Sequence, residues 1–341
     1  MRPLVLAAVL GLAIPVEAQE PPATARDMLV SVLGFTPEHL ERLDRGEVVL
    51  GNTLFAEGDE FAIAGAVRVR GDRALFVRTM HPGWRYAHPS GGTQMGVFSD
   101  PPQVADLDGL RLDASMISDI RECRPGRCGI QLTTTAMEAL QEGIDWSSPS
   151  FEEAVRQKAR EVMVTAIRDY QANGYGDALP FADARRPVDR VVAFDEMLAR
   201  ARAEREYDPR LHDYLADYPR GTEEGIEDTF YWIRTGGVSG VADPSVNVVH
   251  AVTLTDPADP GRVTFVDRLL YSTQYVLVSL GETMISDDPE GEGSFYVVRL
   301  QRVQFRVGGG LAHGVVMKKV QGAMRQSLTA ELELARTVAQ R

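Results

Sequence analysis

The sequence predicts an α+β fold in which a curved antiparallel sheet packs against one long C-terminal helix. Residues 229–307 contain stretches in which apolar and polar residues alternate, as in strands with one buried face. Three glycines at 308–310 interrupt the chain, and an apolar stripe at three- and four-residue steps then runs almost to residue 341. The C-terminal part therefore reads as four strands followed by an amphipathic helix, with an apolar space between helix and sheet.

The N-terminus has the features of a secretory signal peptide, residues 1–18. Arg2 gives a positive start, residues 4–16 are apolar, and small residues stand at Val16 and Ala18, where a signal peptidase reads the chain. The protein is therefore predicted to be exported, with an uncleaved anchor as the alternative. The apolar run is too short to span a bilayer, and no other segment is apolar enough to predict a transmembrane helix in the mature chain.

Residues 19–45 form an N-terminal segment that ends in a helix. The first residues of this segment are rich in proline. Thr36 is a favourable N-cap, Pro37 suits the first helical position, and Gly46 ends the helix.

Strands then begin before a helical block. At 61–70 the odd-numbered residues are mostly apolar and the even-numbered ones are alanine or arginine, which predicts a strand with one buried face. Asp72 caps a short helix, and residues 93–99 form another short strand. These elements belong to the segment 46–100.

Residues 101–226 have mainly helical patterns. The clearest helices are predicted at 151–170 and 188–206, each with one apolar side. Because strands lie on both sides of this block, we expect residues 46–100 and 227–341 to form one discontinuous domain with a helical insertion. Two independent domains are the alternative.

Composition limits the classes of partner. The formal net charge is −13, and the basic residues do not gather into one run. Nucleic acid is therefore not expected as a partner, since neutralising phosphates requires a concentrated basic face.

The two cysteines flank a turn. Cys123 and Cys128 enclose Arg-Pro-Gly-Arg, and the Pro-Gly pair favours a type II turn that brings the flanking residues together. An oxidising compartment lets the two thiols form a disulfide. A redox pair is the alternative, although such pairs usually have two intervening residues. A metal site is not expected, because no histidine is near in sequence to complete the ligands.

Two neighbouring strands suggest a polar pair on a buried face. In residues 246–254 the large apolar residues and His250 share the even positions, and in residues 263–277 the apolar residues and Asp267 share the odd positions. A hairpin centred on the loop between them places His250 directly opposite Asp267. The pair is interpreted either as a polar spot or general base in an apolar cavity, or as a mutually satisfied pair inside a core.

Further side chains are candidates for the same cavity. Tyr271 and Tyr275 share the phase of Asp267, and Arg299 interrupts an apolar face in residues 294–307. An inward arginine would need an anionic partner or a ligand carboxylate. A β-bulge that turns Leu300 inward and Arg299 outward is favoured instead, and in a plain hairpin Arg299 would lie apart from Asp267.

The terminal helix contributes the remaining candidates. Met317 and Met324 lie on its apolar stripe, and methionine suits an adaptable pocket wall because it fills irregular space. A plain core stripe is the alternative. No cofactor is predicted.

The order of elements resembles the helix-grip fold of the START and polyketide-cyclase-like superfamily. The resemblance covers residues 46–100 and 227–341, and it implies binding of a lipid-like or other apolar molecule between sheet and helix, with cyclase or hydrolase activity possible. Short segments also resemble an uncharacterised group of exported bacterial proteins. They are Gly96-Val-Phe-Ser-Asp-Pro-Pro102, Cys123-Arg-Pro-Gly-Arg-Cys128, Ile144-Asp-Trp146 and Tyr231-Trp232.

Three functions follow as hypotheses. The first is an exported bacterial protein, periplasmic or secreted, that binds or carries an apolar or amphiphilic small molecule. The second is an enzyme that uses His250 and Asp267 as an acid–base pair. The third is an interaction protein whose helical insertion docks a partner at the cell envelope, which a large exposed apolar patch would favour.

Overall fold

The computed structural model describes residues 24–82, 94–175, 180–201, 205–206, 208–236, 244–257, 261–289, 291–306 and 313–340. The predicted signal peptide, residues 1–18, lies outside these ranges.

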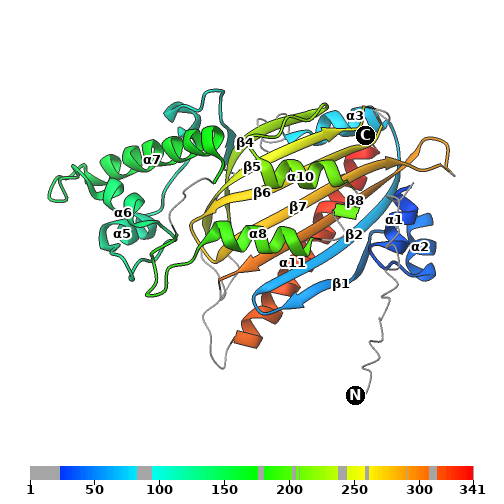
Figure 1. The fold of residues 1–341 in the computed structure, drawn as a ribbon, viewed down its shortest axis with the longest axis horizontal. Helices are drawn as coiled ribbons and strands as arrows, with labels where there is room; N and C mark the ends of the chain where they lie inside the picture. Colours follow the sequence, from blue (N-terminus) through cyan, green and yellow to red (C-terminus); the bar gives the residue numbers. More distant parts are fainter. Residues whose placement is uncertain are drawn as a thin grey trace, which may run out of the picture.

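One curved sheet of eight antiparallel strands forms the centre of the molecule (Figure 1). Its strands are β1 (Val49–Glu57), β2 (Glu60–Arg70), β3 (Met95–Val97), β4 (Ile226–Thr235), β5 (Ser245–Thr255), β6 (Val263–Ser272), β7 (Val276–Asp287) and β8 (Ser294–Phe305). Their order across the sheet is β1-β2-β8-β7-β6-β5-β4-β3. Strands from before and after the insertion therefore share one sheet, because β2 pairs with β8 and β3 pairs with β4.

The predicted fold class is confirmed, with one correction to the strand count. The C-terminal part contains five strands, β4 to β8, where four were predicted. The region predicted as the single strand 263–277 is a hairpin, since β6 ends at Ser272 and β7 begins at Val276. Tyr275 in this turn adopts a φ of 46°, the left-handed conformation that tight turns require.

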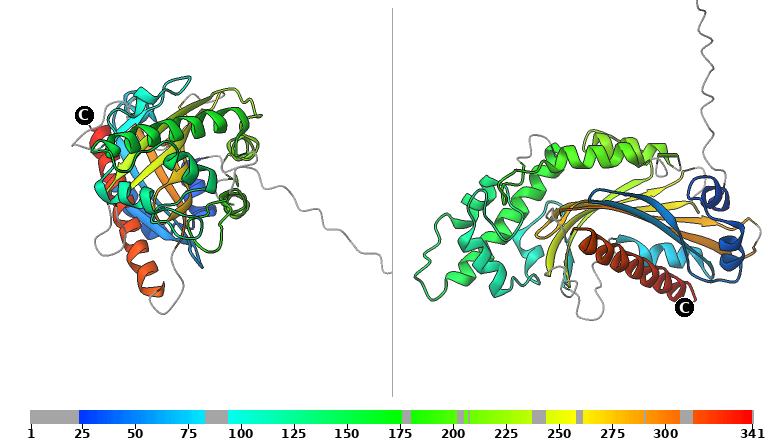
Figure 2. Two further views of the ribbon diagram at one scale, coloured as in Figure 1. Left: turned by 90° about the vertical axis from the view of Figure 1, so that its left-hand side faces the viewer. Right: turned by 90° about the horizontal axis from the view of Figure 1, so that it is seen from below.

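Helices cover both faces of the sheet (Figure 2). The long helix α11 (His313–Ala339) and α3 (Arg73–Met80) lie in the concave face, while α8 (Arg190–Arg200) and α10 (Pro209–Asp217) lie over the convex face. The short helices α1 (Ala25–Ser31) and α2 (Pro37–Asp44) pack near β1, and Thr36 caps α2 as predicted. Helices α5 (Ala114–Glu122), α6 (Thr134–Gln141) and α7 (Phe151–Asn173) lie toward one end of the sheet (Figure 1). The 3₁₀ helix η1 (Val104–Leu107) lies beside β3 and β4.

The C-terminal half of α11 packs directly on the sheet. Leu328, Leu332 and Ala335 are buried against β2, β6 and β8 in one apolar cluster. Gly65 of β2 allows this close approach, because a Cβ atom there would lie 2.7 Å from Leu332 Cδ1. Along this half of the helix, the space between helix and sheet is filled by side chains.

Candidate ligand-binding site

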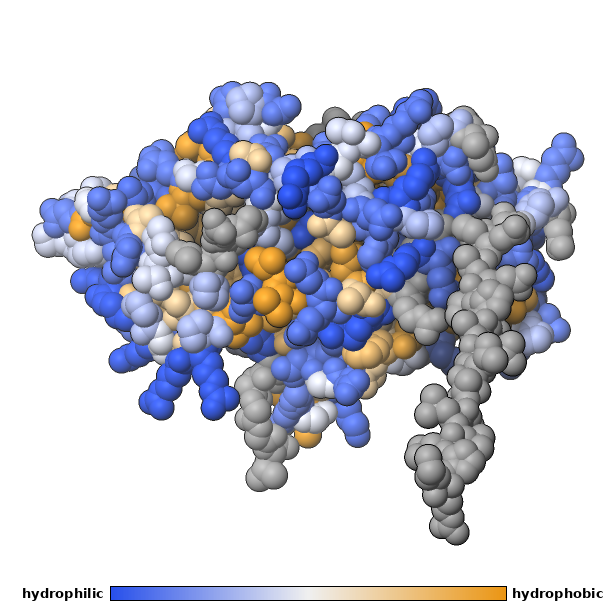
Figure 3. All heavy atoms as spheres, viewed as in Figure 1, coloured by the Kyte–Doolittle hydropathy of each residue, from blue (hydrophilic) through white to orange (hydrophobic). Residues whose placement is uncertain are grey.

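An apolar cavity lies inside the helical insertion, beside the ends of β5 and β6. Its volume is about 590 Å³. Helices α5, α6 and α7 form most of its wall, and Val246 of β5 and Tyr271 of β6 close the side next to the sheet. The apolar lining includes Leu112, Met116, Ile120, Ile130, Leu132, Ala136, Leu140, Ala159, Val162, Met163, Ala166 and Phe181. Apolar surface is visible where the insertion meets the sheet, within a mostly hydrophilic exterior (Figure 3).

Small residues explain why the helices leave a space. Ala136 of α6 faces the cavity together with Ala159 and Ala166 of α7. Alanine side chains cannot fill the gap between two helices that larger neighbours hold apart, such as Leu140 and Met163. The apolar stripe of α7 thus serves partly as cavity lining, whereas Val155 and Ile167 are buried in clusters of the core.

The disulfide loop supports one wall of this cavity. Cys123 and Cys128 are bonded, with a Cα–Cα distance of 4.3 Å, as predicted. Gly126 has a φ of 82°, which suits the third position of the predicted type II turn. Cys128 N–H donates to the carbonyl oxygen of Asp183 at 2.9 Å, so the loop is fixed to the chain that precedes α8. The residues that follow the loop, Ile130 and Leu132, line the cavity.

Polar side chains also contribute to the lining, and they include Thr133 and Thr135 at the start of α6 and Asn173 at the end of α7. Arg190, the first residue of α8, lines the cavity with Tyr175 and Thr273. Its Nη1 donates to the carbonyl oxygen of Leu270 at 2.8 Å, and its guanidinium group lies 5.2 Å from the ring centroid of Tyr175. Solvent-exposed Asp169 of α7 also contributes to the lining.

Tyr170 connects the cavity to a buried histidine. One part of its side chain lines the cavity, and its hydroxyl lies 3.2 Å from Nδ1 of His250. Nε2 of His250 lies 2.6 Å from Oδ1 of Asp228, whose Oδ2 accepts a hydrogen bond from Tyr214 at 2.6 Å. Because a carboxylate accepts, Nε2 carries the proton and Nδ1 accepts from Tyr170.

His250 is fully enclosed. Its side chain is 0% exposed, and Phe230 stacks on the ring with centroids 4.6 Å apart. Burial lowers the pKa of His250 below 6.5, because desolvation disfavours the imidazolium, and the hydrogen bond with Asp228 opposes this effect. Burial also raises the pKa of Tyr170, so its hydroxyl stays protonated and available as a donor.

The predicted pairing of His250 with Asp267 is wrong. In the β5–β6 ladder His250 lies opposite Arg268, and Asp267 lies opposite Ala251. The register differs by one residue from the prediction, so the two side chains point to opposite faces of the sheet. His250 faces α7 and Asp267 faces α11. The predicted acid–base pair therefore does not form, since the sheet separates its members.

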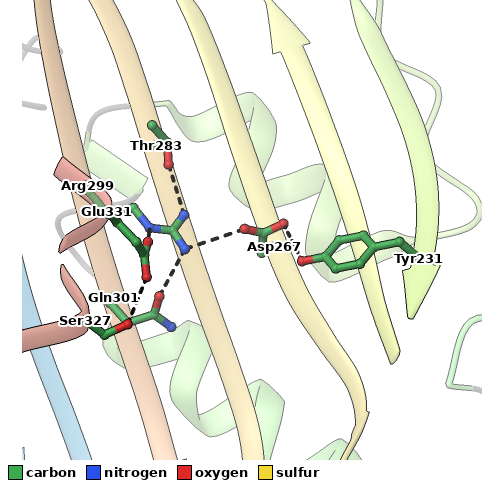
Figure 4. Close-up of polar contacts among 7 residues, drawn as sticks. All are labelled: Tyr231, Asp267, Thr283, Arg299, Gln301, Ser327 and Glu331. Carbon is green, nitrogen blue, oxygen red and sulfur yellow. Dashed lines mark hydrogen bonds and ion pairs between the residues drawn. The ribbon is translucent and has the colours of Figure 1, made fainter. Parts of the chain in front are cut away.

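Asp267 instead belongs to a polar cluster on the concave face (Figure 4). Its Oδ2 lies 3.5 Å from Nη2 of Arg299, and its Oδ1 accepts from the hydroxyl of Tyr231 at 3.1 Å. Nε of Arg299 lies 3.3 Å from Oε2 of Glu331 of α11. Thr283 and Gln301 accept hydrogen bonds from the same guanidinium group.

The predicted β-bulge at Arg299 is also wrong. Strand β8 pairs with β2 and β7 without interruption around this residue, so Arg299 faces α11 and Leu300 packs on the convex face. Gly281 of β7 makes room for the guanidinium group, because a Cβ atom there would lie 2.6 Å from Nη2. Arg299 and Asp267, predicted to lie apart, are in contact, and two carboxylates compensate the largely buried positive charge.

The other predicted site residues are distributed over the molecule. Tyr271 lines the cavity, whereas Tyr275 lies in the exposed turn between β6 and β7. Met324 packs on the apolar cluster beneath α11, and Met317 is buried; neither lines the cavity of the insertion. Their role in ligand binding stays a prediction.

Two searches of the described residues gave negative results. In the ranges given above, no three histidine, cysteine, aspartate or glutamate side chains are grouped closely enough to hold a metal ion. Among the same residues, no helix combines the length and apolar character that crossing a membrane requires.

Comparison with known proteins found no matching protein-family model and no matching curated protein. Among solved structures, the chain is similar to the Zhui aromatase/cyclase from Streptomyces sp. R1128, with a TM-score of 0.26 and 17% identity. The match covers 39% of this chain and 84% of that chain. Similarity at this level identifies neither a family nor an activity.

Proposed function

We propose that this protein is an exported binding or carrier protein for an apolar or amphiphilic small molecule. The observation that supports the proposal is the cavity of about 590 Å³ inside the helical insertion. Small-molecule sites are typically concave spaces of roughly 300–1,000 Å³ with a mostly apolar lining and a few placed polar groups. The cavity has this size and this type of lining.

The proposed binding place differs from the one that the sequence predicted. A ligand was expected between the sheet and α11, against Met317 and Met324. Leu328 and Leu332 fill the space beneath the C-terminal half of this helix. The insertion provides the open volume instead, with small side chains on its inner helix faces. Binding is proposed without a reaction, because the candidate acid–base pair of His250 and Asp267 is divided by the sheet.

Ligand extraction tests the proposal first. We expect an apolar or amphiphilic molecule to co-purify, detectable by native mass spectrometry and by solvent extraction of the purified protein. The neutral fluorescent probe N-phenyl-1-naphthylamine should then bind to the extracted protein with one saturable site.

A cavity-filling variant tests the location. Ala166→Trp on α7 places an indole at the exposed part of the cavity lining and should abolish probe binding while the protein stays folded. Ala154→Trp is the matched control, because Ala154 is on the same helix, is exposed as Ala166 is, and does not line the cavity. Unchanged probe binding in Ala166→Trp, or no probe binding to the parent protein, would refute the proposal.

A further inference from the structure

Arg190 is a cation at the cavity wall without an acidic partner among the described residues. Its Nε atom is enclosed and makes no hydrogen bond there. Its Nη1 donates to the carbonyl oxygen of Leu270, and the guanidinium group lies over the rings of Tyr175 and Phe181. Leaving a buried donor unpaired is unfavourable. Several partly buried arginines have a carboxylate at hand, as Arg306 has in Asp183 at 2.7 Å.

A second arginine lies behind the same wall. Arg268 is only 4% exposed, and its guanidinium group lies 4.5 Å from the ring centroid of Tyr175, which Arg190 also contacts. Its Nη1 donates to the carbonyl oxygen of Leu215, its Nε has no hydrogen-bond partner, and no carboxylate of the described residues forms an ion pair with it. Two guanidinium groups thus meet at one tyrosine of the cavity wall.

The carboxylates of this region do not cancel that charge at the wall. Asp169 lines the cavity but is exposed to solvent, where its charge is screened. Asp228 is engaged by His250 and Tyr214. Arg190 is therefore the partly buried charge of the lining, with Asp169 at its exposed part, whereas Met116, Ile120 and Leu140 line an apolar part of the cavity.

We infer that the cavity selects an amphiphile with one carboxylate, which binds Arg190 while its apolar body lies against α5 and α6. This inference rests on the proposed function and names the class of its ligand. A carboxylate in the cavity would accept hydrogen bonds from the outer nitrogens of Arg190, since the enclosed Nε is out of a ligand's reach, and charge-assisted hydrogen bonds to a guanidinium group are among the strongest in proteins.

Two probes of equal chain length test the charge requirement. Decanoate and decanol are titrated against protein loaded with N-phenyl-1-naphthylamine, and displacement is measured. We expect decanoate to bind at least about tenfold more tightly than decanol. In Arg190→Met the affinity for decanoate should fall by about tenfold or more, and by clearly more than the affinities for decanol and for the neutral probe.

The control is Arg186→Met, which removes an exposed positive charge four positions before Arg190 and should change neither affinity. Equal affinities for decanoate and decanol in the parent protein would overturn the inference, and so would a loss of both affinities in Arg190→Met with a folded protein. Arg190→Lys distinguishes charge from packing, since it should retain part of the preference for decanoate. If the neutral probe binds in the cavity but decanoate binds no more tightly than decanol, the proposed function stands. Only the inference that the ligand carries a carboxylate is then refuted.

Discussion

Replacement of Leu332 by alanine tests whether α11 is packed tightly on the sheet. Leu332 is 1% exposed and contacts the cluster that joins α11 to β2 and β8. Truncating a buried leucine to alanine lowers the unfolding free energy by about 2–5 kcal/mol when neighbouring side chains do not fill the space that is left. Leu334→Ala is the control on the same helix, because Leu334 is 49% exposed, and its cost should stay within about 0.5 kcal/mol.

A second substitution makes the test specific to this contact. Gly65→Ala alone should cost about 1–3 kcal/mol, because its Cβ would lie 2.7 Å from Leu332 Cδ1 and 2.8 Å from Leu50 Cδ2. In the double variant the new methyl group enters the space that Leu332 vacates. The combined cost should therefore be smaller than the sum of the single costs by about 1 kcal/mol, and Leu50 limits the recovery.

Urea unfolding followed by circular dichroism gives the four free energies, with linear extrapolation to water. Strictly additive costs would refute the contact between Gly65 and Leu332. A cost of less than about 1 kcal/mol for Leu332→Ala would show that the helix is loosely packed. In that case the space beneath α11 would again be a candidate for the ligand.

Three further predictions concern charges and the disulfide. Burial lowers the pKa of His250 below 6.5 in the folded state, so the unfolded chain takes up a proton first as the pH falls. The unfolding free energy should therefore fall as the pH drops below about 6.5. In urea titrations at several pH values, His250→Gln should remove this component of the pH dependence. Asp267→Asn combined with Glu331→Gln should cost more than the sum of the single variants, by about 1–3 kcal/mol in a double-mutant cycle, because either carboxylate alone still compensates Arg299; additivity would contradict a shared charge. Reducing the disulfide, which closes a loop with a sequence separation of only 5, should lower the unfolding free energy by about 2 kcal/mol, and a larger loss would mean that the cavity wall depends on it.

The sequence predicted the layers of the fold but not the register of its central strands. Alternation identifies a buried face only when the other face is exposed, and here helices cover both faces. Even residues of β5 from His250 to Leu254 and odd residues of β6 from Val263 to Leu269 are mostly apolar, yet they lie on opposite sides of the sheet. The pairing of His250 with Asp267 followed from treating these two sets as one face.

The turn at residues 273–275 was missed for a different reason. It contains threonine, glutamine and tyrosine, with no glycine, proline or asparagine to mark it. Because this turn was not recognised, β6 and the start of β7 were predicted as one strand, and Arg299 was expected to lie apart from Asp267. Once β7 is recognised as a separate strand, its glycine at 281 lies between the two residues and allows their contact.

The cavity could not be predicted from the helical pattern. The apolar stripe of α7 was recognisable in the sequence, but the pattern does not indicate which helix or strand packs against that stripe. Alanines at 136, 159 and 166 are the available signal, since three small residues on facing helices leave volume. The signal becomes useful only after α6 is known to lie against α7.

The position of Tyr170 gives the protein an internal spectroscopic reporter. Its ring borders the cavity, and its hydroxyl is the hydrogen-bond partner of an imidazole that solvent does not reach. The Nε2 proton of His250 should exchange slowly and give a nitrogen-15 resonance distinct from those of the other histidines in the sequence, which has six with His250 included. A molecule that enters the cavity and displaces Tyr170 would shift this resonance, so occupancy could be followed by nuclear magnetic resonance without attaching a probe group to the protein.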